Sequence, residues 1–357
     1  MNVVLIGLSV TSSWGNGHAT NYRGLIRALT AHGHDVLFLE RDMPWYAANR
    51  DLPCPPHGRT ELYGSVSELR DRFAADVAAA DLVVVGSYVP DGIEVGRWAT
   101  STAGGVVAFY DIDTPVTLAA LERGVCDYLT ADLIPAYDVY LSFTGGPTLA
   151  RLEQDYGSPR AVAFYCLVDA EAYQPLDVDS RWDLGYLGTY SDDRQPALER
   201  LLIEPARRRP DLRFVVAGPQ YPKAIAWPDN VERIDHLPPA EHPAFYAAQR
   251  LTLNITRADM IRAGWSPSVR LFEAAACAVP VVSDRWDGLD QIFRVPSELL
   301  IADTTGDVLA ALEQVDATRR TAIGSAARSR VLAEHTTEHR AEQLESLVAE
   351  VRTKESV

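Results

Sequence analysis

Residues 266–284 read SPSVRLFEAAACAVPVVSD, a helical pattern that runs directly into a short apolar strand. Ser266 and Pro267 are typical of a helix start, where serine caps free N–H groups and proline fits the first turn. Arg270 and Glu273 stand among apolar neighbours, three positions apart and therefore on one helical face. Two charges in so apolar a segment indicate that this face meets something other than the protein core.

Short apolar runs alternate with helical patterns on both sides of this segment. Strands are predicted at 3–8, 35–39, 82–86, 106–110, 139–143 and 161–165, then at 183–187, 213–217, 231–234, 251–255, 280–283 and 299–301. Helices are predicted at 18–31, 66–79, 147–156, 196–207 and 243–248, and the sequence is mostly helical from 305 to 352. This alternation favours α/β domains in which helices cover both faces of a parallel sheet.

The alternation lapses between residues 168 and 183, VDAEAYQPLDVDSRWD, and then restarts. A chain of 357 residues is long enough for two ordinary domains. We therefore predict two doubly wound α/β domains, the first covering residues 1–170 and the second covering 171–335. In such sheets ligands bind at the carboxyl ends of the strands, so the residues that follow each strand are the candidates for function.

The amino-acid composition disfavours some classes of binding partner. Asp and Glu outnumber Lys and Arg by 49 to 33, a formal charge of −16, which disfavours binding to nucleic acid or to an anionic membrane surface. Lys223 and Lys354 are the only lysines, so phosphate contacts must fall to arginine and backbone N–H groups. The four scattered cysteines predict neither a disulfide framework nor a zinc site. The N-terminal MNVVLIGLSV is a first strand, and the sequence predicts a cytoplasmic protein with no membrane span.

The loop after the first predicted strand is rich in glycine and small polar residues, GLSVTSSWGNGHATNYRGL at 7–25. Its glycines allow close approach of the backbone to a ligand, and a helix start follows. Ser12, Ser13, Asn16 and His18 are suited to the recognition of hydroxyl groups. For His18, a catalytic role and a structural, capping role are both open.

The stretch VVAFYDIDTPVT at 106–117 admits three interpretations. A phosphatase with an aspartyl-phosphate intermediate is disfavoured, because Pro115 replaces the expected Thr or Val and Lys223 is wrongly placed relative to the acidic pair. A metal site formed by Asp111 and Asp113 is the second. The third is the polar mouth of a crevice, in which Asp113 faces a substrate hydroxyl or acts as a base.

In the second half, LGYLGTYSDDRQPALERLL at 184–202 combines a strand end with a candidate phosphate pocket. Gly188 ends the strand, Thr189 begins a tight polar loop, and Arg194 stands just before a helix. Glycine, small hydroxyls and arginine at a helix start suit a phosphate. A surface loop with a capping residue is the alternative.

The segment that begins at 266 is the second half of this candidate site. The helix N-terminus carries partial positive charge, and Arg270 adds a full positive charge one turn further along. Glu273 follows as an acceptor for a pair of hydroxyls such as a ribose diol. The pattern suits a nucleotide diphosphate, whereas an Arg270–Glu273 ion pair on a solvated helix face is the competing interpretation.

With these residues in view, the chain resembles the GT-B glycosyltransferases, most closely the CgeB-like (spore-maturation) branch of the group 1 glycosyltransferases. The resemblance is specific over residues 186–194 (YLGTYSDDR), 213–222 (RFVVAGPQYP) and 246–293, and it extends to YDIDTP at 110–115. It implies two Rossmann-like domains facing each other across a cleft. It also implies metal-independent transfer of a sugar from a UDP- or GDP-linked donor to an acceptor hydroxyl. The N-terminal domain would bind the acceptor, the C-terminal domain would bind the donor, and a helix at about 336–357 would pack back on the first.

The resemblance also assigns roles to residues. Glu273 matches the glutamate that holds the nucleotide ribose, and Arg194, Ser268 and Arg270 match contacts to the diphosphate, beside the Gly188–Thr189 loop. If transfer inverts the anomeric centre, Asp113 or His18 is the base; if it retains, both position the acceptor. Trp265 stands eight positions before Glu273, where many retaining members have glutamate, so the stereochemical outcome stays open.

Three other functions remain compatible with the sequence. A sugar-nucleotide epimerase could have the same two-domain fold and would act on the donor without an acceptor. A metal-dependent transferase would use Asp111 and Asp113. A non-catalytic protein would bind a nucleotide and turn nothing over.

Overall fold

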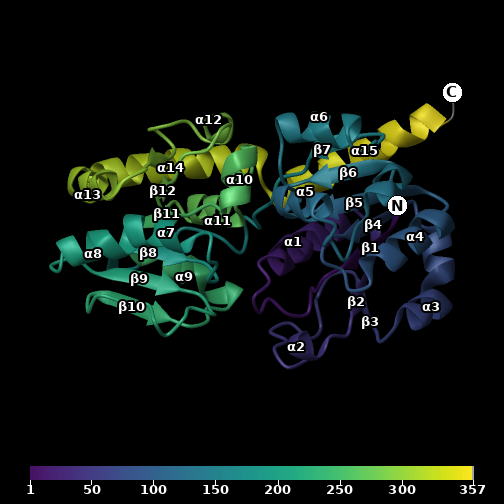
Figure 1. Cartoon of the computed structure of the whole chain (residues 1–357), viewed down its shortest axis with the longest axis horizontal. Helices are drawn as coiled ribbons and strands as arrows, with labels where there is room; N and C mark the ends of the chain where they lie inside the picture. The colour runs from purple at the N-terminus through teal and green to yellow at the C-terminus, as the bar shows by residue number, and fades with distance from the viewer. Residues whose placement is uncertain (356–357) are drawn as a thin grey trace. The chain divides into compact units, whose positions relative to one another are not determined.

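The computed structural model describes residues 1–355 and consists of two compact units (Figure 1). Unit 1 comprises Met1–Leu167 and the C-terminal residues from Thr337, and unit 2 comprises Val168–Thr336. The sequence prediction placed the second domain at residues 171–335. The final two residues of the predicted C-terminal helix, 356–357, lie outside the described part of the chain.

Unit 1 contains a parallel sheet of seven strands in the order β3-β2-β1-β4-β5-β6-β7. Its strands are β1 (Asn2–Gly7), β2 (Asp35–Arg41), β3 (Arg59–Tyr63), β4 (Leu82–Gly86), β5 (Val106–Asp111), β6 (Val139–Ser142) and β7 (Ala161–Ala163). Its helices are α1 (His18–Ala31), α2 (Pro44–Ala47), α3 (Val66–Ala79), α4 (Gly92–Thr102), α5 (Thr114–Glu122), the 3-10 helix η1 (Ala131–Ala136), α6 (Pro147–Gln154) and α15 (Thr337–Glu355).

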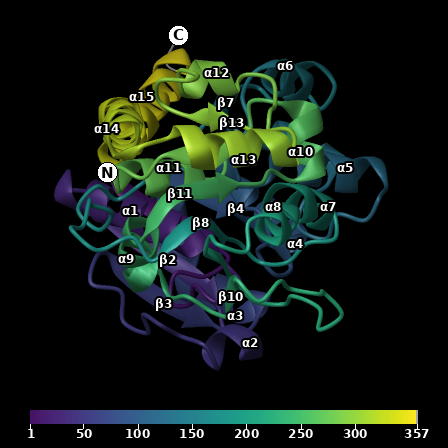
Figure 2. The ribbon, with the colours of Figure 1, turned by 90° about the vertical axis from the view of Figure 1, so that its left-hand side faces the viewer.

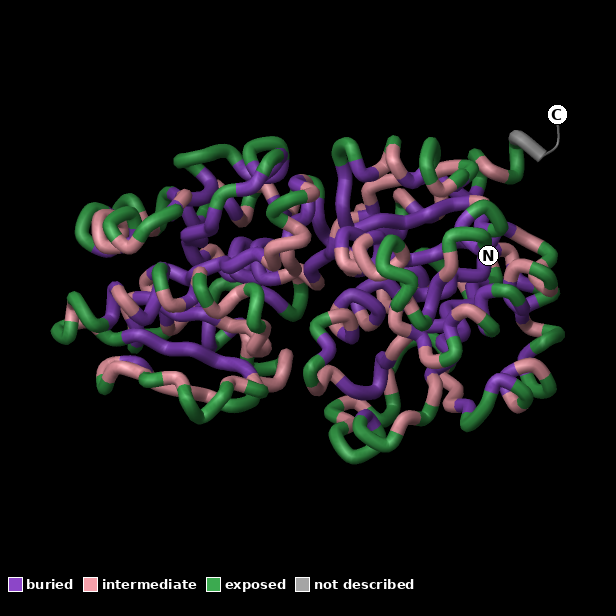
Figure 3. Tube along the Cα trace, in the orientation of Figure 1, coloured by how far each residue is buried: buried purple, intermediate pink, exposed green. Residues whose placement is uncertain are grey.

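Helices cover both faces of this sheet, as the apolar strands require. On one face α3, α4 and η1 bury Phe73 and Trp98 against strand residues such as Phe109. On the other face α1 and α15 lie side by side (Figure 1), and Tyr22 of α1 meets Phe38 of β2 with 5.0 Å between ring centroids. The strands are buried along most of their length, and exposed residues lie on the helices and the connecting loops (Figure 3).

Unit 2 repeats this plan with six parallel strands in the order β10-β9-β8-β11-β12-β13. The strands are β8 (Trp182–Leu187), β9 (Phe214–Ala217), β10 (Val231–Ile234), β11 (Gln249–Asn254), β12 (Val281–Ser283) and β13 (Leu300–Ile301). The helices are α7 (Gln195–Leu198), the π-helical turn η2 (Glu199–Ile203), α8 (Glu204–Arg208), the 3-10 helix η3 (Pro239–Glu241), α9 (His242–Ala247), α10 (Ala258–Ala263), α11 (Val269–Ala276), α12 (Leu289–Ile292), α13 (Thr305–Gln314) and α14 (Ala317–Glu334).

The core of unit 2 lies on both sides of its sheet. The continuous helical stretch α7–η2–α8 and helix α13 pack on one face through residues such as Leu201 and Leu312. Helices α9 and α11 contact β11, and α14 packs on α11 (Figure 2). All seven α11 residues from Arg270 to Ala276 are buried. The prediction of two doubly wound α/β domains is confirmed.

The prediction lacked several elements, and one helix start was wrong. The missing elements are β3, α2, α4, α5, η1, η3, α10 and α12. The edge strand β3 is RTELY, too polar to be recognised, and α4 and α5 begin in segments rich in glycine and proline. The start of α11 lies after Ser266 and Pro267, because its N-cap is Ser268. The preceding Trp265 has a left-handed φ of 43° and donates its backbone N–H to Asp287, which holds this segment out of the helix.

Within residues 1–355 no helix combines the length and the apolar character needed to cross a bilayer.

Candidate functional site

Each sheet has one point where the strand order reverses, and this point locates the candidate sites. In unit 1 it lies between β1 and β4, and in unit 2 it lies between β8 and β11. In doubly wound sheets the loops that leave the carboxyl ends of the strands at this point turn in opposite directions, and the crevice between them is the usual ligand position. Most of the predicted site residues lie at or next to these two crevices.

Arg270 bridges the crevice of unit 2. Its side chain donates from Nε to the carbonyl of Leu187 at the end of β8, and from Nη1 to Asn254 Oδ1 at the end of β11, at 2.7 Å. The guanidinium also lies over the Tyr186 ring, 4.7 Å from its centroid. Arg270 is only 7% exposed. A buried cation is therefore fixed at the switch point by two neighbouring strands.

Gly188 leaves room for this arginine. A Cβ atom at position 188 would lie 2.9 Å from Arg270 Nη2 and 2.6 Å from the Tyr186 hydroxyl, closer than real Cβ contacts. Nη2 itself donates to no residue within 1–355. Guanidinium groups present several N–H donors in a fixed plane, so this nitrogen remains available to an anion.

Asn254 organises the crevice, and the sequence prediction missed it. It is fully buried, and its Oδ1 accepts from both Ser268 Oγ and Arg270 Nη1 at 2.7 Å. Its Nδ2 donates to Ser283 Oγ at 2.9 Å. The Ser268 side chain therefore binds Asn254 and does not cap its own helix. An asparagine at the end of an otherwise apolar strand, LTLNI at 251–255, was the available signal.

Glu273 lies one turn further along α11 and is 3% exposed, so the prediction that it faces outward is wrong. Its Oε2 accepts from the Tyr246 hydroxyl at 3.1 Å and lies 3.5 Å from His242 Nδ1. It forms no ion pair with Arg270 among the described residues, so the competing interpretation of a solvated ion pair is also wrong. Tyr173 also forms a side-chain hydrogen bond with the carboxylate of Glu273.

Arg194 and Thr189 border the same crevice. Arg194 Nη2 donates to the carbonyl of Thr189 at 2.8 Å, so the side chain of Arg194 folds back onto the loop that precedes it. The Tyr221 hydroxyl donates to the carbonyl of Gly188 at 3.1 Å and fixes the strand end. The predicted residues of this half of the site, from Gly188 to Arg194 and from Ser268 to Arg270, therefore converge on the carboxyl ends of β8 and β11.

In unit 1 the structure brings His18 and Asp113 to the same edge, and a third residue, Tyr88, lies between them. The Tyr88 hydroxyl donates to Asp113 Oδ2 at 3.0 Å, and the Tyr88 and His18 rings are stacked with centroids 6.3 Å apart. Tyr88 follows β4 and has a left-handed φ of 62°. Burial, followed by the charge of Asp113, raises the pKa of Tyr88, so it stays a hydrogen-bond donor. The sequence prediction missed this tyrosine.

Asp111 is enclosed and does not share a site with Asp113. Its oxygens accept from the Tyr140 hydroxyl at 2.5 Å and the Thr117 hydroxyl at 2.8 Å, and the residue is fully buried. Burial raises its pKa from 3.8 to about 6. Both oxygens face protein donors, so the Asp111–Asp113 pair does not present two carboxylates to one cation. No group of three His, Cys, Asp or Glu residues in the described chain could hold a metal ion.

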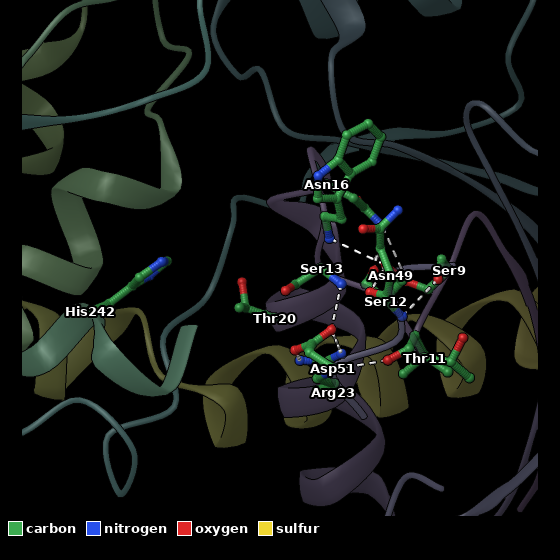
Figure 4. A network of polar contacts seen from close by, with 12 residues as sticks. Ser9, Thr11, Ser12, Ser13, Asn16, Thr20, Arg23, Asn49, Asp51 and His242 are labelled. Atoms are coloured by element: carbon green, nitrogen blue, oxygen red, sulfur yellow. Dashed lines mark hydrogen bonds and ion pairs between the residues drawn. The ribbon is translucent and has the colours of Figure 1, made fainter. Parts of the chain in front are cut away.

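The loop from Ser9 to Gly17 is tied together by its own side chains (Figure 4). Ser12 Oγ donates to the carbonyl of Asn49 at 2.8 Å, Asn16 Nδ2 donates to the Ser9 carbonyl at 3.4 Å, and the Ser13 N–H donates to Asp51 at 2.7 Å. The expected role of Ser12 and Asn16 in recognising substrate hydroxyls is therefore replaced by a structural one. The loop is a stiff support for the start of α1.

Comparisons with known proteins agree with this geometry. Residues 194–346 match the family model described as glycosyl transferase-like. The comparison with curated proteins gave no significant match.

Among solved structures, sucrose-phosphate synthase from Thermosynechococcus elongatus is 16% identical, with 99% of each chain covered and a TM-score of 0.72. Anabaena HepE, solved with UDP and glucose, is 13% identical, with 98% of this chain and 99% of that chain covered and a TM-score of 0.73. An α-glucosyltransferase solved with UDP-glucose and DNA is 11% identical, with 97% and 98% covered and a TM-score of 0.72. The fold shared over nearly the whole length shows that the chain has two Rossmann-like domains of the GT-B type, and residues 194–346 match a glycosyl transferase-like family model.

Proposed function

We propose that this enzyme transfers a sugar from a nucleotide-diphosphate sugar to an acceptor hydroxyl, with the donor bound by unit 2 and the acceptor bound by unit 1. The observation that carries the proposal is Arg270, a buried cation at the switch point whose Nη2 has no partner among residues 1–355. UDP is the favoured nucleotide, because HepE and the α-glucosyltransferase were solved with UDP or UDP-glucose. Within the group 1 glycosyltransferases we assign the chain to the CgeB-like branch, on the residue patterns at 186–194 and 246–293.

The donor chemistry follows from the charges at the crevice. Arg270 and the N–H groups at the start of α11 would receive the diphosphate, and Arg194 lies on the adjoining loop. These groups stabilise the negative charge that grows on the diphosphate as the sugar leaves. The carboxylate of Glu273 would accept the ribose hydroxyls. Arginine and the helix end supply positive charge themselves, so we propose a reaction that needs no metal ion.

The acceptor chemistry centres on Asp113. It occupies the N-cap position of α5. The Tyr88 hydroxyl fixes one carboxylate oxygen, and His18 stacks on Tyr88. An acceptor hydroxyl bound by Asp113 is therefore oriented and polarised. In an inverting transfer the same carboxylate takes the proton.

The substitution Arg270→Lys tests the donor site. Lysine keeps the positive charge but cannot bridge Leu187 and Asn254 while presenting a further N–H group. We expect the dissociation constant for UDP-glucose, measured by isothermal titration calorimetry, to rise about tenfold or more, since hydrogen bonds to charged groups contribute ~1.5–3 kcal/mol.

Arg262→Lys on α10 is the matched control, because its side chain is 70% exposed and pairs with Asp259 alone among residues 1–355. Its affinity for UDP-glucose should equal that of the wild type. Unchanged affinity in Arg270→Lys would rule out this donor site. Release of UDP that requires an acceptor would separate transfer from epimerisation, and release that persists in EDTA would argue against a metal-dependent transferase.

A further inference from the structure

Residues 257–264, which we call the strap, lie between β11 and α11 and contain the short helix α10. None of the α10 residues is buried, and Ile261 is 39% exposed although its side chain is apolar. Segments with few buried contacts are the ones that open most readily in a folded protein. The strap therefore differs from the buried strand and the buried helix that it joins.

Both ends of the strap are anchored. Before it, Thr256 donates its backbone N–H to Asp284 Oδ2 at 2.8 Å and its hydroxyl to Oδ1 at 2.7 Å, and both residues are buried. After it, Trp265 donates its backbone N–H to the Asp287 carbonyl at 2.6 Å and its indole N–H to Gln291 at 2.9 Å. Motion of this segment is therefore confined to the residues between the two anchors.

One carboxylate ties the strap to the other side of the crevice. The backbone N–H of Ala258 donates to Asp193 Oδ2 at 3.0 Å. Among residues 1–355, this is the one hydrogen bond that joins the α10 residues to a residue outside the strap. Asp193 lies on the loop after β8, and its other oxygen accepts from the Ser191 hydroxyl. The loops after β8 and β11 are thus connected by a single bond.

The charge of Asp193 strengthens this bond. Partial burial disfavours its ionised form. The hydrogen bonds from Ser191 and Ala258, together with the charge of Arg257, outweigh burial and hold the pKa of the carboxyl below its usual value. An ionised acceptor forms the stronger hydrogen bond. The Asp193 side chain is also 30% exposed, so water competes for it and the bond can open.

The two loops are joined at two levels. Arg270 connects them where the strands end, through the Leu187 carbonyl and Asn254. Asp193 and Ala258 connect them again several residues further along each loop. A diphosphate bound to Arg270 would therefore lie between these two connections, and the outer one controls its entry.

We propose that the strap is a lid for the donor site and that the bond between Asp193 and Ala258 is its latch. This inference rests on the proposed function, because it assumes that the nucleotide-diphosphate sugar binds at Arg270. The latch opens to admit the donor and closes after it, which keeps water away from the bond between sugar and diphosphate. Arg262 takes no part in the latch, since its side chain is 70% exposed.

Ala258→Pro tests the latch, because proline lacks the N–H that Asp193 accepts. Position 258 is the first residue of α10, where proline fits, and the preceding Arg257 is extended with a ψ of 147°, as a residue before proline prefers. We expect the dissociation rate of UDP-glucose, measured by stopped-flow tryptophan fluorescence, to rise about five- to tenfold, the effect of one lost hydrogen bond. In hydrogen-exchange measurements, UDP-glucose should slow exchange of the strap amides in the wild type and less so in the variant.

Ala317→Pro is the matched control, since Ala317 is exposed, begins α14 and also follows an extended residue. Its dissociation rate and its strap exchange should equal those of the wild type. An unchanged dissociation rate in Ala258→Pro, or strap exchange that UDP-glucose does not slow in the wild type, would overturn the latch and leave the donor site standing. If neither UDP-glucose nor GDP-glucose binds the wild type, the proposed function fails together with this inference.

Discussion

Asp113→Asn is expected to lower kcat for sugar transfer by about 100-fold or more, the lower end of the range for the loss of a positioned base. Asparagine keeps the size of the side chain and can still accept from the Tyr88 hydroxyl, which lies 3.0 Å from Oδ2. It loses the negative charge that attracts the acceptor hydroxyl proton. The measurement is the steady-state rate of nucleotide release with the best donor and acceptor pair.

Binding of UDP-glucose is the control for this variant, because Asp113 belongs to unit 1 and the proposed donor residues to unit 2. Its affinity should equal that of the wild type. A kcat within about threefold of the wild type would contradict any role for Asp113 in handling the acceptor. The anomeric configuration of the product, determined by NMR, then assigns the role: inversion makes Asp113 the base, and retention makes it an acceptor-positioning residue.

Asp111→Asn is expected to raise the stability of the protein at neutral pH relative to acidic pH. The Asp111 carboxyl has a pKa of about 6 in the folded chain instead of 3.8, because burial penalises its charged form. A folded state that holds the proton more tightly gains stability below pH 3.8 and loses it as the pH rises through about 6. The whole effect is about 3 kcal/mol, of which about 2 kcal/mol falls between pH 4.5 and 7.5.

Urea denaturation of wild type and Asp111→Asn at several pH values measures this difference. The free energy of unfolding of the variant, relative to that of the wild type, should increase by about 2 kcal/mol from pH 4.5 to pH 7.5. Asp71→Asn, at an exposed position on α3, is the control. Its free energy of unfolding relative to the wild type should be the same at every pH. A flat difference for Asp111→Asn as well would show that this buried carboxyl does not titrate as its surroundings imply.

Most of the fold could be predicted from the sequence, because parallel strands buried on both faces are continuous apolar runs. Runs such as LVVVG at 82–86 and VERI at 231–234 have the same bounds in the structure as in the prediction. The polar edge strand β3 lacks this signal. Residues Arg59–Tyr63 form a strand because they pair with β2. This pairing depends on the fold and leaves no signal in the local sequence.

The site was predictable in its location but not in its geometry. The charges at 270 and 273 marked the right helix, yet the direction in which they point depends on where β8 and β11 end. Asn254 and Tyr88 gain their importance from contacts with residues distant in sequence, Arg270 and Asp113. No spacing along the chain reveals such contacts. For Ser12 and Asn16 the sequence suggested a role in binding, whereas their side chains form hydrogen bonds to backbone carbonyls of the protein itself.

A crystal structure of the protein with UDP is the most direct test of the donor site. We expect a diphosphate oxygen within hydrogen-bond distance of Arg270 Nη2, next to the N-terminus of α11, and the ribose hydroxyls on the carboxylate of Glu273. A nucleotide bound elsewhere, touching neither Arg270 Nη2 nor Glu273, would contradict this donor site.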